Sequence, residues 1–76
     1  MKAYRVQLSA INDVKEFVSA VSMFDFDVDL ISGRYKVDAK SIMGIFSLDL
    51  SKPIDLEAHT EDAETIEKAL GKFVVK

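Results

Sequence analysis

The chain has 76 residues, of which 49% are hydrophobic and none is cysteine. This length holds one domain, residues 1–76, and the lack of cysteine excludes disulfides and thiolate chemistry, so folding must depend on packing and regular structure alone. Lys and Arg number 10 against 13 Asp and Glu, a formal charge of −3 without a basic stripe, which argues against direct binding of nucleic acid.

The N-terminal segment predicts a strand rather than a targeting signal. Tyr4, Val6 and Leu8 alternate with polar residues, the period of a strand with one buried face. No apolar run resembles the core of a signal peptide, and none approaches the roughly 20 residues of a membrane span. We therefore expect a cytoplasmic protein with no contact to a membrane.

The following segment predicts a helix capped by Asn12 and ending near Met23. Its apolar residues fall at positions i, i+3, i+4 and i+7, which is the spacing of one buried stripe. These residues are Val14, Phe17, Val18 and Val21.

The stretch FDFDVDL, residues 24–30, predicts a second strand with an apolar face and a row of aspartates in water. Aspartates in a row on one strand face do not converge as they do in a looped calcium site, so no metal site is expected. Ser32 and Gly33 then predict a hairpin turn into a strand over residues 35–39, whose flanking Arg34 and Lys36 could face the aspartates.

The rest of the chain predicts a short helix from Ser41, a strand over residues 54–58 after Pro53, and a last helix from about Asp62. All four strands alternate, so each has one wet face and the helices should cover the other face. The fold class is α/β, more narrowly α+β: a two-layer open-faced sandwich with a four-stranded antiparallel sheet, in the order strand, helix, strand, strand, helix, strand, helix.

The short helix carries more apolar side chains than one buried face needs. Ile45 and Leu48 share one side of it, whereas Ile42, Met43 and Phe46 occupy a separate arc. If the first two dock on the sheet, the other three form an exposed patch of the kind that marks a partner site. The alternative is that the small domain wraps all five side chains.

The segment VDAKSIMGIFSL, residues 37–48, resembles the region around the regulatory serine of HPr, the small phosphocarrier of the bacterial sugar phosphotransferase system. The predicted order of elements is also that of the HPr fold, and the resemblance runs from about Val18 to the last helix. It implies that Ser41 is phosphorylated by an ATP-dependent HPr kinase and that a partner surface includes Lys40, Ile42, Met43 and Phe46. A phosphoserine at a helix start meets free N–H groups and the positive end of the helix dipole. A serine in this place is otherwise simply an N-cap.

The HPr family carries phosphate on a histidine at the start of its first helix, in a Gly-x-His-x-Arg-Pro segment. The corresponding stretch here, LSAINDVKEF, has no histidine, arginine or proline, and Asp13 brings negative charge where the family offers positive charge. The resemblance is therefore to a divergent, Crh-like member that does not transfer phosphate from phosphoenolpyruvate. His59, the single histidine, follows the fourth predicted strand in an acidic segment and is assigned no role.

Two functions remain open at this stage. The first is a regulator that, like Crh-like proteins, is phosphorylated by an HPr kinase-like enzyme and then binds a LacI-type repressor. The second is an HPr-fold interaction or assembly module that needs no phosphorylation and binds an unknown protein or a second copy of itself as a homodimer. Neither function is that of an enzyme or needs a cofactor, since the sequence has no Gly-rich phosphate loop and no Cys/His cluster.

Overall fold

The computed structural model describes residues 1–75, and its elements follow the predicted order. They are β1 (Lys2–Val6), α1 (Ile11–Val21), β2 (Val28–Ser32), β3 (Tyr35–Asp38), α2 (Ile42–Phe46), β4 (Ile54–Ala58), α3 (Ala63–Leu70) and the 3₁₀ helix η1 (Gly71–Phe73). No helix in this part of the chain is long and apolar enough to cross a membrane.

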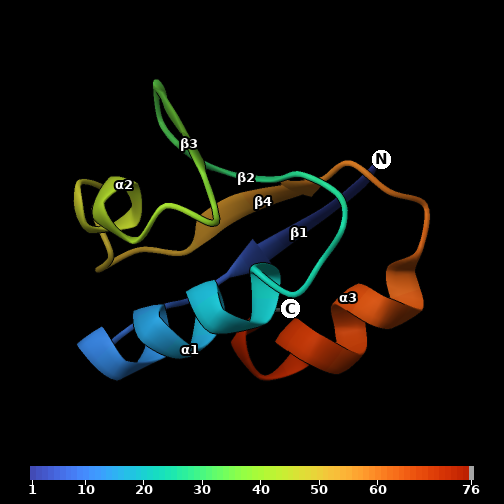
Figure 1. Ribbon diagram of the computed structural model, residues 1–76. Helices are drawn as coiled ribbons and strands as arrows, with labels where there is room; N and C mark the ends of the chain where they lie inside the picture. Colours follow the sequence, from blue (N-terminus) through green and yellow to red (C-terminus); the bar gives the residue numbers. More distant parts are fainter. Residues whose placement is uncertain (76) are drawn as a thin grey trace.

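The four strands form one antiparallel sheet in the order β1-β4-β2-β3. Figure 1 shows α1 and α3 together on one side of this sheet, with α2 beside β3, which it contacts. The predicted two-layer open-faced sandwich is confirmed.

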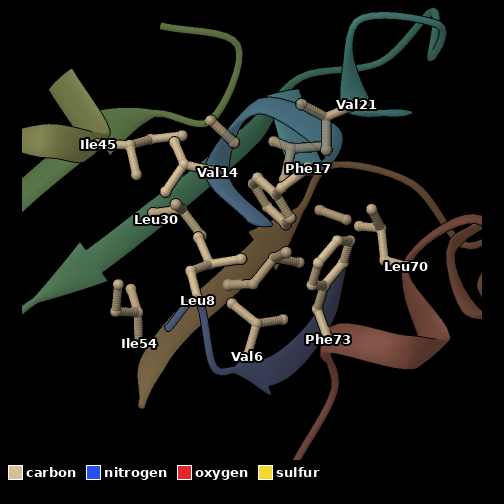
Figure 2. Packing of buried hydrophobic residues seen from close by; sticks show 14 of the residues in the cluster. Val6, Leu8, Val14, Phe17, Val21, Leu30, Ile45, Ile54, Leu70 and Phe73 are labelled. Atoms are coloured by element: carbon tan, nitrogen blue, oxygen red, sulfur yellow. The ribbon is translucent and has the colours of Figure 1, made fainter. Parts of the chain in front are cut away.

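The core fills the layer between the sheet and the helices (Figure 2). Phe17 of α1 lies at its centre, fully buried, and meets the Phe73 ring edge to face with 5.8 Å between centroids. The inward residues of the strands surround it, as their alternation predicts: Val6, Val28, Leu30, Ile54, Leu56 and Ala58. Every fully buried residue within residues 1–75 is apolar.

The start of α1 differs from the prediction that Asn12 caps it. The helix begins at Ile11 with Ala10 as N-cap, and Asn12 lies exposed in the first turn. The carboxylate of Asp13 reaches back and accepts hydrogen bonds from the backbone N–H groups of Ser9 and Ala10, both at 3.1 Å. This acid in the third helical position satisfies amides that a side chain before the helix usually satisfies.

The predicted second strand is too long, because β2 begins only at Val28. Val28 already pairs with Ala58, the last residue of β4, and Asp29 pairs with Asp38, the last residue of β3. No strand residue is left to pair with Phe24 or the residues up to 27, and alternation alone cannot make a strand without a partner. These residues instead form part of the connection from α1, where the rings of Phe24 and Phe26 stack at 4.7 Å.

The hairpin between β2 and β3 is confirmed, and Gly33 makes its turn. Ser32 pairs with Tyr35 across the two-residue turn, and Gly33 has φ +60° at the first turn position. A positive φ at this position is that of a type II′ turn, which glycine adopts without the Cβ clash of other residues.

The outward face of the sheet carries charges that neutralise one another. Asp29 lies opposite both Asp38 and Glu57 in the sheet register. Lys36 offsets these acids, since its Nζ lies 3.7 Å from Asp29 Oδ2 and 3.6 Å from Glu57 Oε1. The ring of His59 also contacts Asp29, with 2.9 Å between Nε2 and Oδ2. Lys36 thus faces an aspartate as predicted, whereas Arg34 lies in the turn. Within residues 1–75 no group of His, Asp and Glu is arranged to hold a metal ion.

The start of α3 depends on Asp62, as the sequence predicts. Its carboxylate accepts hydrogen bonds from the Thr65 hydroxyl at 2.6 Å and from the Thr65 backbone N–H at 3.1 Å. These bonds, the hydroxyl first, hold the pKa of Asp62 below its ordinary value of 3.8. Because the folded pKa is the lower one, the carboxylate stabilises the fold above the unfolded pKa, and this contribution is lost as pH falls through the folded pKa.

We therefore predict that Asp62→Asn flattens the acid side of the stability profile. Asparagine still caps the helix but does not titrate, so the variant should lose less of its unfolding free energy than the wild type when pH falls below about 4. Urea unfolding at a series of pH values measures this difference. Identical profiles for the two proteins would contradict it.

Candidate functional site

Ser41 caps α2 and keeps its hydroxyl at the surface. Its backbone is extended, with φ −101° and ψ 103°, and its Oγ accepts a hydrogen bond from the Gly44 N–H at 3.3 Å. Its carbonyl accepts from the Ile45 N–H at 3.1 Å, and its own N–H donates to the Asp38 carbonyl at 2.9 Å. The predicted helix start is confirmed, and the exposed hydroxyl is held in a fixed position.

Gly44 allows α2 to approach β3 closely. A Cβ added at Gly44 would lie 3.3 Å from Ser41 Oγ and 3.3 Å from Val37 Cβ, which is tighter than ordinary van der Waals contact. The glycine therefore leaves room both for the capping hydroxyl and for the packing of α2 on the sheet.

The apolar residues of α2 divide into a buried and an exposed set. Ile45 is fully buried and Leu48, just after the helix, is 7% exposed, whereas Met43 is 75% and Phe46 39% exposed. Ile42, predicted to be exposed with them, is instead partly buried, because it packs against the core. We call Ile42, Met43 and Phe46 the α2 patch. The alternative in which the domain wraps all five side chains does not occur, because Met43 and Phe46 remain at the surface.

Lys40 is held against the end of α1. Its Nζ lies 3.2 Å from the carbonyl oxygen of Phe24, and its backbone N–H donates to Asp38 Oδ1 at 2.9 Å. The Phe24 carbonyl belongs to the connection just after α1, so this bond ties the start of α2 to that connection. The sequence gives no sign of this contact, because Lys40 and Phe24 are 16 positions apart.

The start of α1 adds an apolar side chain that sequence reasoning missed. Ile11 is 64% exposed. Phe17 faces η1 through its contact with Phe73, and on a helix Ile11 and Lys15 lie on the flank away from Phe17. α1 contacts both α2 and α3.

Comparisons with known proteins agree with this fold. The family model described as "PTS HPr component phosphorylation site" matches residues 12–76. A crystal structure of HPr-C-His from Thermoanaerobacter tengcongensis has 32% sequence identity and a TM-score of 0.78, over 95% of this chain and 89% of that chain. The phosphocarrier protein HPr from Bacillus anthracis str. Ames has 30% identity and a TM-score of 0.72, over 97% and 96%. A comparison with curated protein sequences gives no match.

The chain belongs to the HPr family of the phosphotransferase system. The resemblance seen in the sequence is therefore confirmed. HPr proteins are carriers that act through other proteins, which agrees with the expectation of a protein-binding domain and not of an enzyme. The match of the family model begins at Asn12 and leaves out residues 1–11.

The capping bond of Ser41 yields a stability prediction. Ser41→Ala removes the acceptor for the Gly44 N–H and should lower the unfolding free energy by about 0.5–1 kcal/mol. Ser41→Asp keeps a capping oxygen and should stay close to the wild type, since aspartate caps helices as well as serine does. Urea unfolding at neutral pH compares the three proteins. If both variants lost the same unfolding free energy, the loss could not come from the capping hydrogen bond.

Proposed function

We propose that this protein is a regulatory member of the HPr family that carries no phosphate on a histidine and is switched by phosphorylation of Ser41. The observation that carries the proposal is the exposed Ser41 hydroxyl at the rim of the exposed α2 patch. The modified residue and the contact surface are thus immediate neighbours.

The start of α1 supports the loss of histidine phosphotransfer. Residues 8–17 contain no histidine. The N–H groups of Ser9 and Ala10 already donate to the carboxylate of Asp13. A phosphoryl group would meet a negative charge here instead of the free amides that bind anions at helix starts.

The environment of Ser41 suits a phosphorylation switch. A kinase would form a bond between Ser41 Oγ and the γ-phosphorus of ATP, break the bond from that phosphorus to the bridging oxygen, release ADP and take up the hydroxyl proton. The product adds about −1.5 to −2 charges beside the α2 patch. The unmodified and the phosphorylated patch therefore fit partner surfaces of different charge. This difference in charge would let a partner bind one form and reject the other. A LacI-type repressor is the partner that the resemblance implies for the phosphorylated form.

The first test is the intact mass of the protein after incubation with an HPr kinase and ATP. We expect the wild type to gain the mass of one phosphoryl group and Ser41→Ala to gain none. Ser47→Ala is a matched control, since Ser47 is also exposed beside α2, and it should be phosphorylated like the wild type. A parallel incubation with phosphoenolpyruvate and the phosphotransferase enzyme that normally phosphorylates HPr should add no mass. An unmodified wild type in the kinase reaction would overturn the switch.

The second candidate function, an assembly module without phosphorylation, is favoured by the apolar exposure alone. Met43 and Phe46 are both exposed on α2, and exposed apolar side chains that gather on one surface mark protein contacts. A second copy of the chain would bury such a surface in a symmetric pair.

If this assembly role holds, Phe46→Lys should shift the protein from dimer to monomer. Light scattering on a size-exclusion column gives the mass directly. Tyr35→Lys is the control, because Tyr35 is 69% exposed on β3, outside the α2 patch, and should leave the mass unchanged. If the wild type and Phe46→Lys were both monomeric at all concentrations, self-association through the patch would be excluded.

A further inference from the structure

The ammonium group of Lys40 links the start of α2 to the segment that follows α1. It donates to the Phe24 carbonyl oxygen at 3.2 Å from a partly buried position. Among residues 1–75 it has no carboxylate within ion-pair distance. Its positive charge is thus held by a neutral acceptor and is available to a stronger one.

Few hydrogen bonds hold the connection between α1 and β2, residues 22–27. The Phe24 N–H donates to the Val21 carbonyl at 3.1 Å, and the Asp27 carbonyl accepts from the His59 N–H at 2.9 Å. Between these two anchors, the bond from Lys40 to the Phe24 carbonyl is the one further hydrogen bond within the described residues. Loss of this bond would leave the backbone between these anchors without a hydrogen bond, while the stacked rings of Phe24 and Phe26 stay packed against the core.

Ser41 is the next residue after Lys40. A phosphoryl group on Ser41 would bring about −1.5 to −2 charges within reach of an ammonium on a flexible four-carbon stem. A hydrogen bond from an ammonium to a charged acceptor is about twice as strong as one between neutral groups. The phosphoryl group therefore competes with the Phe24 carbonyl for the same donor.

We propose that phosphorylation of Ser41 moves the Lys40 ammonium from the Phe24 carbonyl to the phosphoryl group and thereby loosens the connection of residues 22–27. The inference rests on the proposed function in one respect, that Ser41 is the modified residue. It adds a second surface to the switch, because this connection exposes Met23 at 85%. A partner can then distinguish the two forms at α2 and at the end of α1.

The test uses the full 76-residue chain made by chemical synthesis, with serine or phosphoserine at position 41. Amide hydrogen exchange measured by NMR reports on the Phe24 and His59 N–H groups, which close the two ends of the connection. Phosphoserine should speed exchange at both by about fivefold, the effect of one hydrogen bond of average strength. The Gln7 N–H, which donates to the Phe73 carbonyl elsewhere, should be unaffected.

A variant of Lys40 shows whether the effect passes through this side chain. Lys40→Met with unmodified Ser41 should exchange as fast at both amides as the phosphorylated wild type, and phosphoserine should add nothing further in this background. Lys52→Met is the matched control, since Lys52 is exposed and forms no ion pair within the described residues, and it should exchange like the wild type.

Either of two results overturns the inference: unchanged exchange at Phe24 and His59 on phosphorylation, or the same increase with phosphoserine in Lys40→Met as in the wild type. The first comparison needs no variant, so it holds even if Lys40→Met does not fold. Because the phosphoserine is introduced by synthesis, a kinase that ignores Ser41 contradicts the proposed function and leaves this measurement interpretable.

Discussion

The packing of α1 on the sheet is the constraint on which the other features depend. A chain of 76 residues without cysteine has one apolar layer with which to offset the entropy of folding. Phe17 lies at the centre of this layer, and α1 contacts both α2 and α3. The helix therefore positions the Ser41 region on one flank and the C-terminal elements on the other.

Different charged side chains make hydrogen bonds near the two ends of α1. At its start, Asp13 accepts the backbone N–H groups of Ser9 and Ala10, which neutralises the end where HPr proteins carry their phosphohistidine. Beyond its other end, Lys40 donates to the Phe24 carbonyl of the connection that follows. The family fold is thus retained, with a carboxylate bonded to the backbone amides at the start of α1.

The surface around Ser41 places a hydrogen-bonded hydroxyl next to the exposed side chain of Met43. Gly44 permits α2 to lie close against Val37, so the backbone at Ser41 has little freedom. Of its neighbours, Met43 is 75% exposed and Lys40 donates to the Phe24 carbonyl. Met43 thus gives this surface one adaptable apolar side chain next to the capped serine.

Periodicity and turn chemistry in the sequence determined the order of the elements, the antiparallel sheet, the starts of α2 at Ser41 and of α3 near Asp62, and the division of α2 into buried Ile45 and exposed Met43. These are local properties, because a side chain one or two turns away decides them. The length of β2 was decided only by tertiary structure, because a strand ends where its neighbours β3 and β4 end. The Asp13 cap was missed because the N-cap position is held by Ala10, which has no capping side chain, so the sequence pattern pointed to Asn12 instead. The bond from Lys40 to Phe24 joins residues 16 positions apart, and such a contact exists only once α1 and α2 have packed together.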